Sequence, residues 1–581
     1  MNKIIFILCI ILILLSISSV NASDNMTDLN IVSSDDNAIF VDVNGADSGD
    51  GSKDSPVLTL DKAISLSKEN GTIYLSNGEF NNALNNKLTI NKSLNFVGAE
   101  DTSVNGLNKN YLFEIKDNVC VSFKNIKFIN AYKSPGSYSI NYNENIYGAA
   151  LEIKNATVTV DSCSFIGNVL NYDEAIGQFI YGGAVSNFGD LTIINSYFAN
   201  NTALSTSGLN SFGGSVYNKG KLSIFNTTFS KSKSVDFGYG AAIANDGEVV
   251  MRDSTICESR ALHETKGSAI YNTGVFELYD SIIENNYIER ANFNYIYGAV
   301  YNIGTLTARG NIFRNNTGYY EAPTPSYKGS PNIYNSGKLN LTYNAFIDNA
   351  AFPGISTDVY YNGGDIVTLD NNWWNTNINP YKEGTKINVD EINSWLILNL
   401  TPDYTKLNIS DSVTIKASWT NNIDLLTQID LIPLFNVTFK TEVDGNVITL
   451  KKQLINGEAD FKFDYTQNKG LYEVTNTLES FTQSVLVDVG KTFTYVNFIV
   501  NDNITYLEDL NVSVEVTSSD GSVPTGVVLL NLNDRTYTVN LVNGKGNCTI
   551  SDLTPQKYTL DITYDGSENH FKAFNRTDVN I

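Results

Sequence analysis

Residues 181–201 read Tyr181-Gly-Gly-Ala-Val185, then Asn187-Phe-Gly189, Leu191-Thr-Ile193 and Phe198-Ala-Asn-Asn201. This pattern joins an aromatic residue, glycine with small residues, an Asn-x-Gly unit, alternating apolar residues and a Phe-x-x-Asn motif. Further copies contain Asn218-Lys-Gly220, Asn245-Asp-Gly247, Asn272-Thr-Gly274, Asn302-Ile-Gly304 and Asn335-Ser-Gly337. A repeat of this length is typical of a solenoid, in which each coil is one copy.

The spacing within the repeat is more regular than the spacing between repeats. Six repeat glycines lie 31, 27, 27, 30 and 33 residues apart: Gly189, Gly220, Gly247, Gly274, Gly304 and Gly337. From each glycine to the apolar residue that opens the Phe-x-x-Asn motif the distance is always 9 residues. A constant segment followed by a variable one indicates a coil with loops on one side. It argues against an antiparallel sandwich with coincidental repeats.

The constant segment predicts short strands and corners. Leu191-Thr-Ile193 and Leu222-Ser-Ile224 alternate with period 2, as strands do. We expect Asn-x-Gly to turn the chain because Asn and Gly tolerate a positive φ. Coils stacked in register then bury their aliphatic side chains in one core. The final Asn of each motif should join a ladder of side-chain amides, predicted at Asn168, Asn201, Asn286, Asn316 and Asn349.

Both ends of the solenoid carry capping signals. Leu60 to Glu69 predicts an amphipathic helix, with Thr59 as its N-cap and Gly71 ending the segment. Such a helix covers the open strand edges of the first coil. At the other end we expect the aromatic pair Trp373-Trp374 to close the last coil; a carbohydrate-stacking platform is the alternative.

These motifs resemble a known class of proteins. The Gly-Gly-Ala-Val and Phe-x-x-Asn pairing is similar to the repeats of polymorphic outer-membrane proteins. It also resembles right-handed parallel β-helix domains in Asn/Thr-rich, adhesin-like surface proteins of methanogenic archaea. The resemblance covers about residues 40–390 and implies a pectin-lyase-like solenoid on a cell surface. Ser232 and Ser259 depart from it by replacing the ladder Asn, and Pro331 interrupts the last copy.

The N-terminal segment predicts export. Met1-Asn2-Lys3 is followed by an apolar run from Ile4 to Leu15, and small residues end at Ala22, as in a signal peptide. An uncleaved membrane anchor is the alternative. We therefore predict a signal peptide at 1–22, a flexible linker at 23–39, the solenoid cap at 40–71 and the β-helix at 72–394. The protein is expected to be secreted or associated with the cell surface.

The pattern changes after Trp395 to longer alternating strands. Val413-Thr-Ile-Lys-Ala417 and Asn511-Val-Ser-Val-Glu-Val516 are examples. Residues 395–490 and 491–581 each suit one β-sandwich, and the second resembles bacterial Ig-like surface domains. The predicted fold is all-β: a right-handed parallel β-helix with a short capping helix, followed by two Ig-like domains.

Composition restricts the function. The formal net charge of −23 argues against nucleic-acid partners, and 2 His leave little for a His-based metal site or catalyst. Asp42, Asn44, Asp47, Asp50 and Asp54 crowd one loop, but the EF-hand spacing is not met. We predict no metal, no cofactor and no obligate small-molecule ligand.

Catalytic groups are not arranged as a polysaccharide enzyme requires. Hydrolases of this kind use paired carboxylates, and Asp253 and Asp280 share one column, six residues after a repeat glycine. Other coils carry Asn195, Asn226, Gly310 and Tyr343 there, so the pair reads as substitution within a column. We predict no enzymatic activity, with a polysaccharide lyase or hydrolase as the alternative.

The variable segments carry the best functional signal. They all fall between Phe-x-x-Asn and the next glycine, and they are rich in Tyr and Asn, which suit contact with sugars or proteins. Ordinary solvated loops are the alternative. The predicted ligand-binding residues are Tyr172, Tyr287, Phe293, Tyr295, Tyr319, Tyr320 and Tyr327. We predict an adhesin-like protein that binds glycans or surface proteins of another cell or of the envelope; a purely structural envelope component is the alternative.

Overall fold

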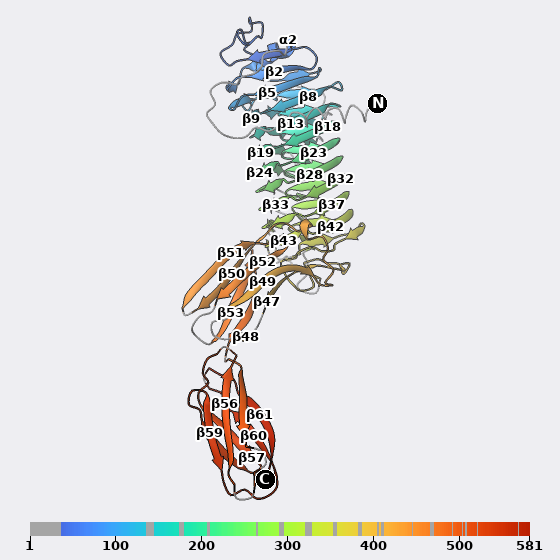
Figure 1. Ribbon diagram of the computed structural model, residues 1–581. Coiled ribbons are helices and arrows are strands. Elements are labelled where there is room, and N and C mark those ends of the chain that lie inside the picture. Colours follow the sequence, from blue (N-terminus) through green and yellow to red (C-terminus); the bar gives the residue numbers. More distant parts are fainter. Residues whose placement is uncertain are drawn as a thin grey trace.

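The computed structural model describes residues 37–581 with internal gaps at 135–144, 173–178, 206–209, 263–264, 290–294, 320–327, 353–356, 382–385, 404–405, 408–411, 444, 465–469, 491, 502–503, 506–507, 520 and 568. The predicted signal peptide and most of the predicted linker lie outside these residues. The described chain forms a long solenoid followed by two antiparallel sandwiches (Figure 1). None of the helices found there is both long and apolar enough to cross a membrane.

Three parallel sheets form the body of the solenoid. Sheet 1 contains β1 (Ala38–Val41), β2 (Gly71–Leu75), β5 (Leu94–Gly98), β8 (Cys120–Lys124), β13 (Thr157–Asp161), β18 (Asp190–Ile194), β23 (Lys221–Phe225), β28 (Glu248–Arg252), β32 (Val275–Tyr279), β37 (Thr305–Arg309), β42 (Lys338–Thr342) and β46 (Ile366–Thr368). Sheet 2 contains β4 (Leu88–Ile90), β7 (Phe113–Ile115), β12 (Leu151–Ile153), β17 (Val185–Asn187), β22 (Val216–Asn218), β27 (Ile243–Asn245), β31 (Ile270–Asn272), β36 (Val300–Asn302), β41 (Ile333–Asn335) and β45 (Val359–Tyr361). Sheet 3 contains β3 (Gly78–Phe80), β6 (Thr102–Asn105), β9 (Lys127–Ile129), β14 (Ser164–Ile166), β19 (Tyr197–Ala199), β24 (Thr228–Ser230), β29 (Thr255–Cys257), β33 (Ile282–Glu284), β38 (Ile312–Arg314) and β43 (Ala345–Ile347).

A second set of strands forms a projection that we call the wing. Its first layer, sheet 4, contains β10 (Tyr132–Lys133), β15 (Val169–Tyr172), β20 (Thr202–Ser205), β25 (Lys233–Val235), β30 (Arg260–Leu262), β34 (Tyr287–Glu289), β39 (Thr317–Tyr319) and β44 (Ala350–Phe352). Its second layer contains β11 (Ile146–Tyr147), β16 (Ile180–Tyr181), β21 (Ser211–Phe212) and β26 (Gly238–Tyr239), and the pair β35 (Tyr295–Tyr297) and β40 (Lys328–Ser330). The variable segments of the repeat connect the two layers.

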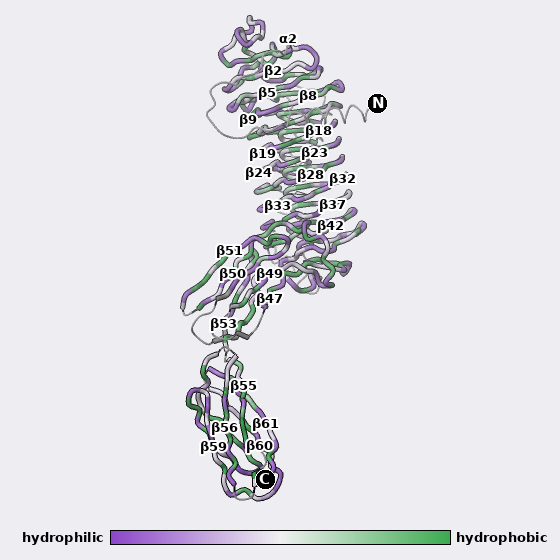
Figure 2. Tube along the Cα trace, in the orientation of Figure 1, coloured by the Kyte–Doolittle hydropathy of each residue, from purple (hydrophilic) through white to green (hydrophobic). Residues whose placement is uncertain are grey.

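The coils stack in register, as the constant spacing predicts. Val185 pairs with Val216, and Val216 with Ile243, and the same residues of each copy fall in one inward column. Hydrophobic and hydrophilic residues alternate along these strands (Figure 2). The parallel β-helix fold is therefore confirmed, and one continuous aliphatic and aromatic core runs through it.

The corner glycines are required for a different reason from the one predicted. Gly220 and the five equivalent glycines lie at the corner between sheets 2 and 1, but none has a left-handed φ. A β-carbon at Gly220 would overlap the carbonyl oxygen of Gly189, and one at Gly247 would overlap that of Gly220. The expectation of positive φ was wrong here: glycine is needed because successive backbones approach too closely for any side chain.

Buried columns of asparagine stabilise the corners. In the predicted ladder Asn168 Nδ2 donates to Asn201 Oδ1 at 2.9 Å, and Asn286 Nδ2 donates to Asn316 Oδ1 at 3.0 Å. The backbone amide of Asn316 donates to Asn349 Oδ1 at 3.0 Å. The Asn-x-Gly residues form a second ladder with amide contacts of 2.6–2.8 Å, through Asn187, Asn218, Asn245, Asn272, Asn302 and Asn335. Every ladder amide is thus partnered, as a buried amide must be.

The N-terminal cap contains the helix α2 (Leu60–Leu66) and the 3-10 turn η1 (Ala83–Asn85). Thr59 caps α2 by accepting from the backbone of Lys62, and Leu60 and Ala63 are buried. The helix ends earlier than predicted, because Ser67 turns to an extended conformation, and Gly71 begins β2. Ala38 and Ile39, which we expected in the linker, belong to β1, since their backbone pairs with β2.

The C-terminal part consists of two sandwiches. The first contains β47 (Leu396–Pro402), β49 (Ser412–Asn421) and β52 (Glu458–Asp464), the turn η2 (Ile429–Leu431), and a sheet of β48 (Lys406–Leu407), β54 (Phe481–Val489), β53 (Gly470–Leu478), β50 (Asn436–Val443) and β51 (Asn446–Gln453). The second contains β55 (Thr494–Val500), β56 (Leu510–Ser518) and β59 (Lys545–Ile550) against β58 (Arg535–Asn540), β57 (Val527–Leu532), β60 (Lys557–Tyr564) and β61 (Ala573–Asn580). Both are antiparallel except for the short β48–β54 pair.

The aromatic pair at the end of the solenoid is buried. Trp374 stacks on Phe346 at a centroid distance of 4.7 Å, and Trp373 contacts Trp419 of the first sandwich at 5.1 Å. Both indoles are 0% exposed. The pair closes the last coil and is not a platform for sugars.

Candidate functional site

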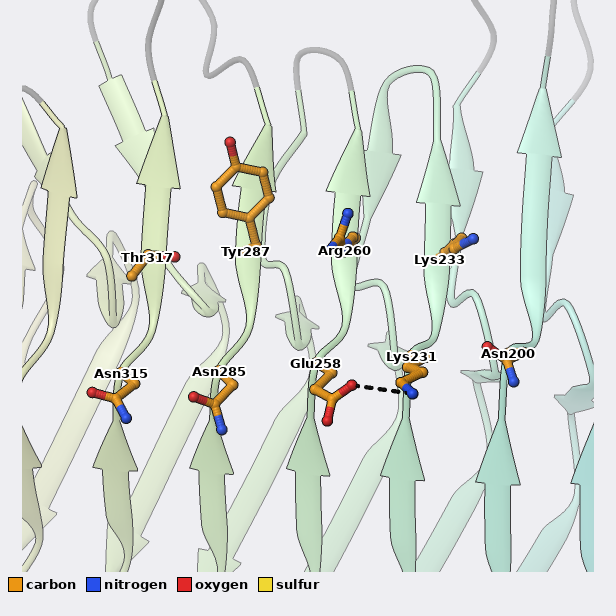
Figure 3. Close-up of a pocket in the computed structure, with 9 residues that line it drawn as sticks. All are labelled: Asn200, Lys231, Lys233, Glu258, Arg260, Asn285, Tyr287, Asn315 and Thr317. Atoms are coloured by element: carbon orange, nitrogen blue, oxygen red, sulfur yellow. Dashed lines mark ion pairs between the residues drawn. The ribbon is translucent and has the colours of Figure 1, made fainter.

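An open polar groove runs along the solenoid where sheet 3 turns into sheet 4 (Figure 3). It encloses about 460 Å³. Its lining residues form two rows that cross five successive coils: Asn200, Lys231, Glu258, Asn285 and Asn315 at the corner, and Lys233, Arg260, Tyr287 and Thr317 on sheet 4. At about 4.8 Å between coils, the corner row is about 19 Å long.

The corner row projects outward because of its backbone conformation. All five residues have a left-handed φ of 51–56°. Each is followed by a residue that turns inward and is buried, namely Asn201, Ser232, Ser259, Asn286 and Asn316. The ladder therefore fixes the corner from inside, while the preceding residue faces the groove (Figure 3).

The left-handed conformation is unfavourable for two residues of the corner row, Lys231 and Glu258. Asn tolerates a left-handed φ well, but Lys231 and Glu258 carry a cost of about 1 kcal/mol each. They also lie directly before Ser232 and Ser259, the two departures from the ladder Asn. Backbone strain is retained where a side chain is needed, so these two coils are candidates for a functional role. The serine departures are the sequence signal that marks this site.

The second row lies on neighbouring strands of sheet 4. Lys233 pairs in register with Arg260, and Arg260 with Tyr287. The Arg260 guanidinium carbon lies 6.0 Å from the Tyr287 ring centroid. In the corner row, Lys231 and Glu258 form an exposed ion pair at 3.4 Å. The groove thus offers amides, a hydroxyl, one ring and three cations against a single carboxylate.

The predicted ligand-binding residues fall into four groups. Tyr287 lines the groove. Tyr172 is 5% exposed and packs with Leu170 and Ile180 in a small core inside the wing, so its ring is structural. Tyr295 and Tyr319 lie on β35 and β39, whereas Phe293, Tyr320 and Tyr327 lie outside the described residues. Sequence reasoning missed Lys231, which directly precedes a ladder position, and Lys233 and Arg260, which directly follow such positions, because the prediction rested on the aromatic residues of the variable segments.

The opposite face of the wing carries a column of stacked rings. Tyr147, Tyr181, Phe212 and Tyr239 stack at centroid distances of 4.7–5.3 Å. Lys266 takes the next place in the column, pairing with Tyr239, and burial lowers the pKa of its ammonium group. Because each ring face is covered by the next ring, this column offers little stacking surface to a ligand.

The carboxylates considered for catalysis lie elsewhere. Asp253 and Asp280 occupy the corner between sheets 1 and 3, both with a φ of 49°. Burial and the neighbouring charge of Asp253 raise the pKa of Asp280, and Arg309 partly offsets this. The pair is therefore separated from the groove by the width of sheet 3.

The acidic loop near the N-terminus has structural partners. Asp47 accepts from the backbone amides of Leu58 and Thr59 at 3.1 and 2.9 Å, and from the Thr59 hydroxyl at 2.9 Å. Asp50 accepts from the backbone amide of Ser52 at 2.9 Å. These bonds hold the turn before α2. Within the described ranges, no group of three or more His, Cys, Asp and Glu could hold a metal ion.

Comparison with known proteins gives likenesses of fold. No protein-family model and no curated protein matches the chain. A rhamnogalacturonan lyase matches with a TM-score of 0.30 and 12% identity over 58% of this chain and 88% of its own. Pectate lyase Pel9A matches with a TM-score of 0.29 and 13% identity over 56% of this chain and 78% of its own. Invasin, a bacterial integrin-binding protein, matches with a TM-score of 0.18 and 18% identity over 32% of this chain and 39% of its own.

Proposed function

We propose that this protein is a secreted or cell-surface, adhesin-like protein that binds glycans through the polar groove. The observation that carries the proposal is the groove, where three asparagine amides, a threonine hydroxyl and the Tyr287 ring line one open path. Amides donate to and accept from sugar hydroxyls, and a tyrosine ring covers an apolar sugar face. The resemblance to adhesin-like proteins of methanogenic archaea supports the same proposal.

In this proposal the two sandwiches are spacers. They extend the chain away from the last coil (Figure 1), so the groove is held at a distance from the C-terminal end. The ladders and stacked core make the solenoid a rigid support, on which groove residues keep their spacing. A rigid array of short contacts suits an extended ligand such as a glycan of another cell or of the envelope.

We also propose that binding occurs without cleavage. Hydrolysis by the two-carboxylate mechanism needs a second acid, whereas the groove contains Glu258 alone and pairs it with Lys231. We expect neither reducing ends nor unsaturated sugars when the protein is incubated with plant or cell-surface polysaccharides. Release of either product would instead establish a lyase or hydrolase.

A glycan array with the intact protein tests the binding proposal. We expect bound glycans to lose about fivefold in affinity with Tyr287→Ala, since a ring contact contributes about 1 kcal/mol. The matched control is Tyr495→Ala, which removes a 59% exposed ring in the second sandwich. Failure of the intact protein to bind any glycan, with no attachment to cells, would favour the purely structural alternative.

The proposed location has its own test. Cell fractionation should place the protein in the medium or at the cell surface. N-terminal sequencing should begin directly after Ala22. A chain that begins at Met1 in the membrane fraction would contradict cleavage and support an N-terminal anchor.

A further inference from the structure

The groove is a positively charged site on an acidic protein. The whole chain has a formal net charge of −23, but the groove is lined by Lys231, Lys233 and Arg260 against Glu258 alone. The Lys231–Glu258 pair at 3.4 Å neutralises two of these charges. Lys233 and Arg260 therefore determine the local charge, and they attract an anion to a surface that otherwise repels it.

These two cations have no carboxylate partner in the part of the chain that the structure describes. Elsewhere on the solenoid, cations do pair with acids: Arg314 contacts Glu284 at 2.6 Å, and Lys154 contacts Glu114 at 2.8 Å. Arg260 contacts the Tyr287 ring, and this leaves its guanidinium edge available to an incoming carboxylate. Unpaired cations side by side on adjacent coils are the feature that distinguishes this groove.

The groove also has a polarity along the solenoid axis. Its charged residues occupy two adjacent coils, those of Lys231 and Glu258, while the following two coils offer Asn285, Tyr287, Asn315 and Thr317. These neutral groups match hydroxyls and an apolar ring face. An extended ligand lying along the groove therefore meets cations in one part and neutral sugar-binding groups in the other.

We propose that the groove binds an acidic oligosaccharide, with uronic acid carboxylates on Lys233 and Arg260 and neutral sugars beside Tyr287 and Asn315. This inference rests on the proposed glycan-binding function and names the ligand class. Arg260 presents a planar fork that binds a carboxylate through two hydrogen bonds, and Lys233 adds a point charge on the adjacent coil. A nucleic acid requires a longer basic footprint than two free cations.

Calorimetry on the intact protein tests the inference with three probes. These are a uronic acid oligosaccharide, the same chain with its carboxyl groups reduced to alcohols, and a glutamate oligopeptide of equal charge. We expect the first to bind at least tenfold more tightly than the second and third. Its affinity should fall as salt is raised, because the contacts are exposed ion pairs.

A charge-matched pair of variants locates the contact. Lys233→Gln with Arg260→Gln should weaken binding of the uronic acid chain about tenfold, the sum expected for two exposed ion pairs. The control, Lys219→Gln with Lys221→Gln, makes the same change in charge at the Asn-x-Gly corner and should leave binding unchanged.

These experiments distinguish a preference for acidic sugars from glycan binding in general. Equal binding of the acidic and reduced chains, lost with Tyr287→Ala, overturns the acidic preference and keeps a glycan-binding groove. Tighter binding of the glutamate peptide overturns the sugar assignment. Equal losses in the two double variants show that binding follows overall charge and overturn the groove as the site. Binding of none of the probes, with an empty glycan array, contradicts both proposals.

Discussion

In this solenoid, contacts with the neighbouring coil restrict which residue type can occupy a position. Gly220 has an ordinary φ, so its own backbone would accept alanine. The restriction comes from the Gly189 carbonyl oxygen, which occupies the place of the missing β-carbon. The same contact recurs along the whole column of repeat glycines, because one coil height separates each from the next.

Replacing Gly220 with Ala should therefore destabilise the solenoid by about 2 kcal/mol or more, as expected for overpacking against backbone. Gly220→Val should cost more. The measurement is the urea midpoint of the solenoid, with Lys219→Ala as a control on the same corner. An unchanged midpoint for Gly220→Ala would show that the coils can separate there without cost.

A buried carboxylate closes the ladder at its C-terminal end. Asp358 Oδ1 accepts from Asn332 at 2.9 Å and from Asn349 at 3.1 Å, and Lys386 Nζ lies 3.3 Å from Oδ2. Burial raises the pKa of Asp358 to about 6 although Lys386 and the two amides act to lower it. Protonation of the Asp358 carboxyl group therefore stabilises the folded state. This stabilisation is lost as the pH rises from about 4 through 6.

Asp358→Asn should remove that pH dependence. We expect wild-type stability to gain on the order of 2 kcal/mol from this site as the pH falls from 7 to 4, and the variant to gain less. Melting curves of both proteins at several pH values measure the difference. The exposed Asp365→Asn serves as control, and parallel wild-type and Asp358→Asn profiles would contradict the assignment.

At the scale of elements, the wing is a small layer with its own core. Ile146, Leu170, Tyr172, Ile180 and Ala203 pack between its two sheets. Strands of two to four residues are too short to be stable alone. They are held because each wing strand pairs with its neighbours in adjacent coils.

This packing predicts that Tyr172 acts on stability and not on recognition. Tyr172→Ser should destabilise the wing by about 3 kcal/mol, since it removes a buried ring. Glycan affinity per folded molecule should stay within about twofold. A loss of binding without a loss of stability would instead show that Tyr172 contacts the ligand.

The strands of the solenoid body could be predicted from the sequence, whereas the wing and the groove could not. The strands of sheets 1, 2 and 3 could be predicted because the repeat glycine and the apolar residue that opens the Phe-x-x-Asn motif are always 9 residues apart. The wing could not, since its strands are short and their spacing varies with the insertions. The groove was missed for a related reason: Lys231 and Glu258 differ from the usual Asn, and their importance depends on a left-handed φ that only the folded corner shows.

At the scale of the whole molecule, the solenoid and the first sandwich share a core. Ala345, Ile347 and Trp373 of the last coils pack with Trp419 and other residues of that sandwich. Arg314 also contacts Glu479 at 3.2 Å. The second sandwich has a separate core, so two units meet near residue 490.

Limited proteolysis should reflect this division. We expect the first cleavage near residues 490–493, leaving the solenoid with the first sandwich as one resistant fragment. Trp373→Ala should expose a second site near residue 395, because loss of a buried indole weakens the junction by about 3–5 kcal/mol. An initial cut near 395 in the wild-type protein would show that the shared core does not join the two parts.

We propose that recognition belongs to the groove and that the sandwiches are spacers. Differential labelling of lysines, measured by mass spectrometry with and without a bound acidic glycan, tests it on the intact protein. We predict that the ligand slows labelling of Lys231 and Lys233, while Lys219 and Lys221 on the same coil keep their rates. Protection of Lys416, Lys451 or Lys545 in the sandwiches, with Lys231 and Lys233 unchanged, would show that the sandwiches bind the ligand and that the solenoid is the stalk.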